Sequence, residues 1–152
     1  MARRSTGFTM VELVVVLAVA GIISAVALPK LFDLTSYRGR SFRDGVVSAL
    51  RFAQKTATSH RRTVCVSFTA STVSLSIVTT SNSSDCSTAT ALPLPNGAAS
   101  VVSADTTNVV FGAATPALLN FSFAIDGTGA DRTLTIAGQP DITVVGATGY
   151  VQ

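Results

Sequence analysis

The chain has 152 residues, of which 47% are hydrophobic and only 12% are charged. This composition excludes an intrinsically disordered chain, which carries few apolar residues and much charge, and the length allows one small domain with an appendage. The net charge of +3 is unevenly spread, because residues 63–152 hold one basic residue against five aspartates. The basic character therefore belongs to residues 1–62.

The N-terminus begins with a basic leader, residues 1–7, and continues as a long apolar segment. Sixteen residues from Leu13 to Leu28 carry no charge, and the segment counted from Phe8 has 21 residues. As a helix this segment would be about 32 Å long, which matches a hydrocarbon core of about 30 Å. We therefore predict a transmembrane helix over residues 8–30.

A secretory signal peptide is the alternative for this segment, because the small residues 24–27 resemble a cleavage site. Three features favour a retained membrane anchor instead. The apolar run is long, Glu12 lies near its start, and a helical pattern resumes after Pro29.

Glu12 is the unusual residue of the apolar segment. A carboxylate costs several kcal/mol at the centre of a bilayer and less near its surface. Cleavage between Gly7 and Phe8 would create an α-amino cation about one helical turn from Glu12. That amine could pair with the acid of its own chain or with the acid of a neighbouring chain.

The stretch Gly7–Leu13, with the sequence GFTMVEL, resembles the class III signal of type IV prepilins. That signal has a basic leader ending in Gly, then Phe-Thr-Leu-x-Glu and an apolar helix; here Met10 replaces the commoner Leu. The resemblance implies that a prepilin peptidase cuts after Gly7 and N-methylates Phe8. It also implies that Glu12 directs assembly, whereas an ordinary anchor with an isolated acid is the alternative.

The same resemblance implies a location and a set of partners. The protein would first be a single-pass protein of the bacterial inner membrane, with its C-terminal domain in the periplasm, and would then enter a pilus or pseudopilus. Its partners would be other pilins or pseudopilins, the prepilin peptidase, the inner-membrane assembly platform and the lipid membrane. No cofactor is expected.

Residues 31–62 carry the pattern of an amphipathic helix. Apolar residues recur at the spacing of one helical face: Phe42, Val46, Ala49, Leu50, Ala53 and Ala57. The small alanines on this face permit close approach to a sheet, so we expect the helix to lie against the C-terminal domain.

The opposite face of this helix is basic. Its candidates for contact with DNA or another anion are Arg40, Arg51, Lys55, Arg61 and Arg62, with Arg38 and Arg43 nearby. The alternative is a solvated face, or one that meets anionic lipid or acidic neighbours in a filament. Few aromatic residues accompany the basic ones and the predicted loops hold no basic cluster, so we do not expect nucleic acid as a partner.

Residues 63–152 are predicted to form a small β-rich domain. Alternating or apolar runs predict strands over residues 63–68, 72–78, 108–111, 121–125, 133–136 and 142–145. A Ser- and Thr-rich loop is expected over residues 79–91, and a hairpin turn over residues 126–129. The fold class is therefore α+β, with a long N-terminal helix packed on a small antiparallel sheet.

The two cysteines, Cys65 and Cys86, are 21 residues apart, which suits neither a zinc site nor a C-x-x-C redox motif. In an exported domain one disulfide is the simplest expectation, with two separate buried thiols as the alternative. The sequence predicts no enzyme, because His60 stands alone near a helix end and no nucleophile or phosphate motif is present. Asp126 and Asp131 could hold calcium, but turn chemistry accounts for them and no metal site is expected.

Within the prepilins, several short matches resemble the minor pseudopilin H and FimT group. They are residues 50–55 followed by Cys65, residues 123–129, residues 134–136, and the ending 146–151, which is similar to minor pilins of the mannose-sensitive haemagglutinin pilus. The resemblance implies the type IV pilin fold and a minor structural subunit. The alternative is a subunit at the filament tip that binds DNA or another ligand, but the Gly-Arg-x-Arg-like tail of FimT-type DNA-uptake pilins is absent here.

Overall fold

The computed structural model describes residues 9–31, 34–81, 83–113, 115–121 and 130–152, without the side chains of residues 26–31. The chain divides into two compact units, Met1–Leu34 and Thr35–Gln152, and each is described by itself.

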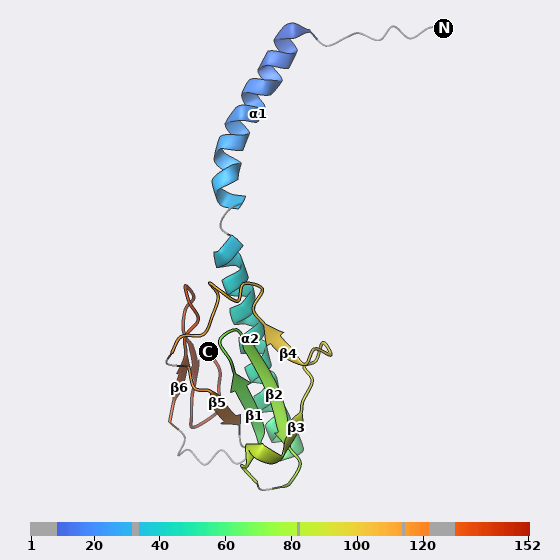
Figure 1. Cartoon of the computed structure of the whole chain (residues 1–152), viewed down its shortest axis with the longest axis vertical. Helices are drawn as coiled ribbons and strands as arrows, with labels where there is room; N and C mark the ends of the chain where they lie inside the picture. Colours follow the sequence, from blue (N-terminus) through green and yellow to red (C-terminus); the bar gives the residue numbers. More distant parts are fainter. Residues whose placement is uncertain (1–8, 32–33, 82, 114, 122–129) are drawn as a thin grey trace, which may run out of the picture. The chain divides into compact units, whose positions relative to one another are not determined.

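Helix α1, Met10–Leu31, makes up the described part of the first unit (Figure 1). It begins at a capped N-terminus, because the Thr9 hydroxyl accepts a hydrogen bond from the backbone N–H of Glu12 at 3.3 Å. The helix continues through Pro29 and ends two residues later. Within the part of the chain that the structure describes, no helix is both long and apolar enough to cross a membrane.

Helix α2, Leu34–His60, supplies one layer of the second unit. Its buried residues are Gly39, Phe42, Val46, Ala49, Leu50, Ala53, Thr56 and Ala57, so the predicted apolar stripe is confirmed. The helix ends where Arg61 turns to φ 51° and the backbone N–H of Arg62 bonds the Ala57 carbonyl at 3.2 Å. The left-handed turn at Arg61 lets the Arg62 N–H satisfy a carbonyl that the helix end leaves free.

The main sheet is antiparallel and has five strands. They are β1 (Val64–Phe68), β2 (Thr72–Val78), β3 (Ala89–Ala91), β4 (Ser100–Val102) and β5 (Leu118–Phe121). Strand β1 lies between β2 and β5, with Val66 opposite both Leu75 and Leu119. Strands β3 and β4 pair with the two ends of the other edge of β2.

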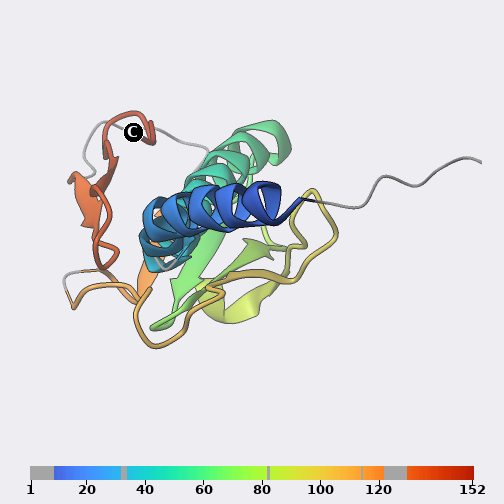
Figure 2. The same ribbon diagram turned by 90° about the horizontal axis from the view of Figure 1, so that it is seen from above.

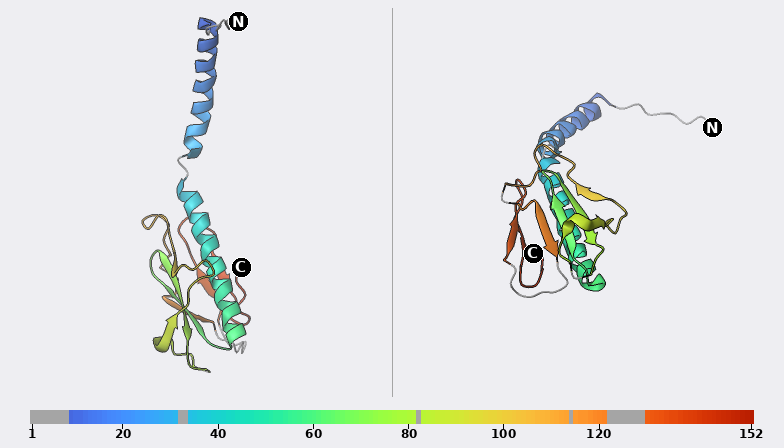
Figure 3. Two further views of the ribbon diagram at one scale, coloured as in Figure 1. Left: turned by 90° about the vertical axis from the view of Figure 1, so that its right-hand side faces the viewer. Right: turned by 60° about the horizontal axis from the view of Figure 1, so that its bottom comes forward.

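One face of this sheet packs on α2. Val64, Val66 and Phe68 alternate along β1 and share a core with Phe42 and the alanines of α2. Figure 3 shows α2 running along one side of the strands, and Figure 2 shows the same arrangement from above. The α+β class and the packing of a helix on a small antiparallel sheet are therefore confirmed.

A second, two-stranded sheet contains β6 (Arg132–Leu134) and β7 (Ile142–Val144). The C-terminal segment returns beside β7, where Thr143 and Gln152 exchange backbone hydrogen bonds of 2.9 and 3.0 Å. Leu134, Ile142, Val144 and Val151 are buried in the same core as α2.

One predicted strand is wrong, two observed strands were not predicted, and two further predictions extend into residues that the structure does not describe. The predicted strand 108–111 is wrong, because Asp105 captures the backbone N–H groups of Thr107 and Asn108 in a turn and only Phe111 makes a bridge. Strands β3 and β4 were not predicted. Of the predicted strand 121–125 only Phe121 is described, and it belongs to β5, Leu118–Phe121; residues 122–125 and the hairpin at 126–129 lie outside the described residues.

Candidate functional site

The predicted processing and assembly residues lie at the start of α1. Gly7 and Phe8 are outside the described residues, and Glu12 lies in the first turn of the helix. Thr9 and Glu12 have the spacing of a capping box. The structure shows one half of that motif, the hydrogen bond from the Glu12 backbone N–H to the Thr9 hydroxyl. This cap was not predicted, although the Thr-x-x-Glu pattern of the sequence could have revealed it.

The large apolar side chains of α1 are open to solvent. The exposed fraction is 73% for Val11, 64% for Leu17 and 69% for Ile22. An apolar surface of this extent on one segment marks a site that another apolar phase or protein covers.

The five basic residues predicted as anion contacts do not form one cluster. Arg40 lies in the second turn of α2 and is exposed, whereas Lys55 and Arg61 lie at its far end. Fifteen residues separate Arg40 from Lys55, which is about 22 Å along a helix. Arg62 is half-buried beyond the helix end.

Arg51 has a structural partner that the sequence did not predict. Its Nη2 donates to the backbone carbonyl of Val151 at 3.2 Å. Nearby, Gln54 Nε2 donates to the Thr148 carbonyl at 2.8 Å, and Arg43 Nε donates to the Pro140 carbonyl at 2.9 Å. These three side chains tie the C-terminal segment to α2. No sequence signal could have found the pairs, because every residue offers a backbone carbonyl.

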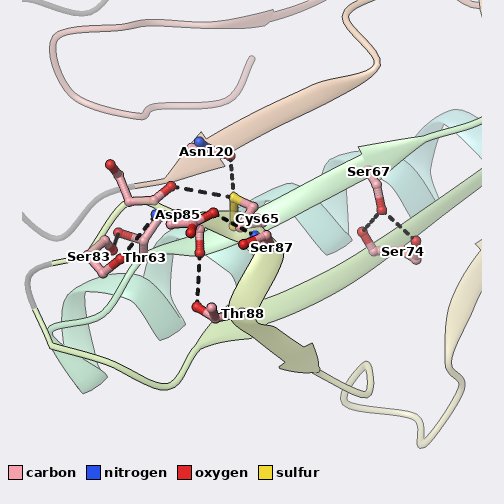
Figure 4. Close-up of a disulfide and its surroundings, with 11 residues drawn as sticks. Thr63, Cys65, Ser67, Ser74, Ser83, Asp85, Ser87, Thr88 and Asn120 are labelled. Carbon is pink, nitrogen blue, oxygen red and sulfur yellow. Dashed lines mark hydrogen bonds between the residues drawn. A yellow bond between two sulfur atoms is a disulfide. The ribbon is translucent and has the colours of Figure 1, made fainter.

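Cys65 and Cys86 form a disulfide, with their Cα atoms 6.0 Å apart (Figure 4). Cys65 lies on the face of β1 opposite α2, and Cys86 starts the short 3-10 helix η1, Cys86–Thr88. Asp85 caps η1 by accepting from the Ser87 N–H at 2.9 Å, and hydrogen bonds from Ser87 lower the pKa of Asp85. The disulfide therefore holds a polar loop against the outer face of the sheet.

We expect the double variant Cys65→Ala/Cys86→Ala to be less stable than wild type by about 3 kcal/mol, since the cross-link closes a loop of 21 residues. Urea unfolding of the wild-type and variant domains under oxidising conditions measures the difference. Wild type with reduced cysteines is the matched control and should lose a similar amount. Equal midpoints for the oxidised and reduced wild type would contradict the prediction.

A hollow of about 320 Å³ lies between the start of α2 and β4. Tyr37 and Arg38 of α2 and Val101 and Val102 of β4 are among its lining residues. Arg38 Nη1 lies 4.0 Å from Oδ2 of Asp105. The backbone and side-chain N–H groups of Asn108 lower the pKa of this carboxyl, with smaller contributions from Thr107 and Arg38.

The candidate metal and catalytic residues are not brought together. Asp131 Oδ1 accepts the backbone N–H of Gly146 at 2.9 Å, and Asp126 lies outside the described residues. His60 is exposed at the end of α2. Among the residues described, no group of three His, Cys, Asp or Glu side chains could hold a metal ion.

Comparison with known proteins gives two matches. Residues 2–28 match the prokaryotic N-terminal methylation motif. The chain is also 38% identical over 55 residues to the type IV narrow pilus major component PilA5 of Thermus thermophilus. This alignment covers 36% of the chain and 47% of that relative, so it spans about half the length of the relative. No solved structure matches the chain significantly. The motif and the similarity together support a type IV pilin-like protein.

Proposed function

We propose that this protein is a structural subunit of a type IV pilus or of a type II secretion pseudopilus. The observation that carries the proposal is the methylation motif at residues 2–28, with Glu12 placed in the first turn of α1. The similarity to a pilus component is consistent with this role. We assign the chain to the minor pilins of the pseudopilin H and FimT group, on its short matches to them.

Processing would create the α-amino group that assembly requires. Cleavage after Gly7 makes the amine of Phe8 the new N-terminus, directly before the Thr9 cap of α1. The amine of one subunit then pairs with Glu12 of a neighbour in an apolar filament core. A charge in such a core is tolerated only when it is paired, so the pair favours subunits that are in register.

Before assembly the subunit would wait in the inner membrane. The uncharged run Leu13–Leu28 and the exposed apolar side chains of α1 support anchoring through residues 8–30. The C-terminal domain would lie in the periplasm, where an oxidising environment maintains the Cys65–Cys86 disulfide.

The proposal is a structural role rather than DNA capture. Arg51 is engaged by the Val151 carbonyl, and Arg40 and Arg61 lie near opposite ends of α2. Binding to successive phosphates of a DNA strand would require these cations to lie closer together.

Mass spectrometry after co-expression with a prepilin peptidase tests the proposal. We expect wild type to lose residues 1–7 and to carry one added methyl group on the amine of Phe8. Gly7→Val should stay uncut, because a branched side chain would lie at the scissile bond. Gly21→Val is the matched control and should be cut normally, since nothing besides its chain neighbours and the backbone of its own helix lies within 4 Å of a Cβ at that position. Uncut wild type would refute the proposal.

A further inference from the structure

We propose that the exposed N-terminal end of α2 contacts the anionic phospholipid surface of the membrane while the subunit waits there. The contact residues are Tyr37, Arg38, Arg40 and Val102, called here the α2 patch. The inference rests on the proposed membrane anchoring and adds a second contact, made by the folded domain itself.

The α2 patch combines apolar and cationic side chains around the N-terminal end of α2. Tyr37 is 73% exposed, Val102 is 56% exposed and the side chain of Arg38 is 45% exposed. On a helical wheel Tyr37 lies between Arg40 and Arg38, and the hollow beside β4 separates Tyr37 and Arg38 from Val102. Tyrosine and arginine a few residues beyond an apolar segment are typical of the membrane–water interface, where an amphipathic side chain meets headgroups.

The arginines of the patch keep donors for an external anion. Arg38 lies 4.0 Å from Asp105, and the oxygens of that acid already accept from Thr107 N and from both nitrogens of Asn108 at 3.0–3.2 Å. The guanidinium has five N–H groups, so this one loose contact leaves most of them unused. Arg40 is exposed to solvent.

The charge of the surrounding helix also favours an anion. Residues 34–43 contain three arginines and no acid; Asp33 precedes and Asp44 follows them. Cations at a helix N-terminus are disfavoured by the positive end of the helix dipole. An anionic surface would therefore be attracted by the arginines and by the backbone of α2 together.

Chain length places the patch within reach of the headgroups. Nine residues separate Leu28, the end of the uncharged run, from Tyr37. That distance is about 14 Å if helical and at most about 30 Å if fully extended. If residues 8–30 span the hydrocarbon core, the chain keeps the patch within about 30 Å of the end of that core.

The other basic side chains of the domain make poor candidates for this contact. Arg43 and Arg51 donate to backbone carbonyls of the C-terminal segment. Arg61 follows Arg38 by 23 residues, about 34 Å along the helix axis. Arg61 and Arg62 therefore provide a matched control with the same charge at the other end of α2.

A fragment of residues 30–152 tests the proposal without the apolar helix. All buried core residues lie between Phe42 and Val151, and both cysteines of the disulfide lie in the fragment, so it keeps a complete core. Its binding is measured by co-sedimentation with vesicles of phosphatidylcholine alone or with added phosphatidylglycerol, at physiological salt. We expect binding only to the vesicles that contain phosphatidylglycerol.

Variants of the fragment locate the contact. Arg38→Gln/Arg40→Gln should weaken binding by about fivefold per arginine removed, whereas Arg61→Gln/Arg62→Gln should leave it near wild type. Tyr37→Ser should also weaken binding without unfolding the fragment, because Tyr37 is exposed. Circular dichroism checks the fold of every variant. Equal loss in the two arginine pairs would overturn the proposal, because attraction by net charge would then explain the binding.

Two further outcomes would also overturn it. Release of the fragment by millimolar glycerol phosphate would show a soluble anion site, and binding to duplex DNA as tight as to the vesicles would show a general polyanion surface. The fragment lacks Gly7 and Glu12, so failure here leaves the processing experiment unaffected. If wild type were not processed, the fragment could still bind lipid, but the role proposed for that binding would be refuted.

Discussion

We expect Glu12→Gln to reduce the recovery of filaments by about a hundredfold while the protein is still cut after Gly7 and retained in the membrane. The substitution keeps the size and the capping ability of the side chain but removes its charge. The amine of a neighbouring Phe8 would then enter the apolar core without a partner. Breaking one half of a buried ion pair costs about 3–5 kcal/mol, enough for an effect of this size.

Thr9→Ala separates the charge of the Glu12 side chain from the cap on its backbone N–H. This variant removes the hydroxyl that accepts the Glu12 N–H at 3.3 Å and leaves the carboxylate in place. Loss of an N-cap costs about 1 kcal/mol, so filaments should form in reduced but easily measured amounts. Sheared filament fractions and membrane fractions, compared by immunoblot, measure both variants.

The opposite ranking would contradict the ion-pair mechanism. If Glu12→Gln assembled normally and Thr9→Ala did not, assembly would depend on the cap at Thr9 and not on the charge of Glu12. Glu12→Ala, which removes the carboxylate but keeps the backbone N–H that Thr9 caps, should then assemble normally as well.

We expect Leu50→Ala to destabilise the folded domain by about 3 kcal/mol. Leu50 is completely buried in the core between α2 and the strands, and alanine maintains the helix propensity at that position. The loss would therefore come from the cavity and from the removed contacts rather than from weaker helix formation. Urea unfolding of the 30–152 fragment, followed by circular dichroism, measures it.

Leu118→Ala is the matched control for Leu50→Ala. Leu118 lies on the edge strand β5 and is 47% exposed, so its truncation should cost less than about 1 kcal/mol. Equal losses for the two variants would mean that α2 is not packed on the sheet as described.

The features that were predicted correctly have a strong local signal. The alternation of Val73, Leu75 and Ile77 predicted β2, and the spacing of Phe42, Val46 and Leu50 predicted the buried face of α2. In both cases the spacing of the apolar residues equals the period of the backbone, so each element could be predicted from its own residues alone.

The features that were missed depend on partners far away in the chain. Strands β3 and β4 have three residues each and exist because the two ends of the β2 edge accept them. Residues 105–111 were predicted wrongly for a local reason. Their sequence is typical of a strand, but the Asp105 carboxylate accepts the backbone N–H groups of Thr107 and Asn108 and holds them in a turn.

The sequence by itself predicted the N-terminal processing and assembly residues, because Gly7, Phe8 and Glu12 lie within six positions of one another and their pattern is local. Only the tertiary structure decided what the arginines do. It joined Arg51 to a carbonyl 100 residues away, and it brought Tyr37 and Arg38 beside Val102 at the free end of α2. The sequence shows which side chains are charged. The fold decides which backbone or surface group lies within hydrogen-bonding distance of each of them.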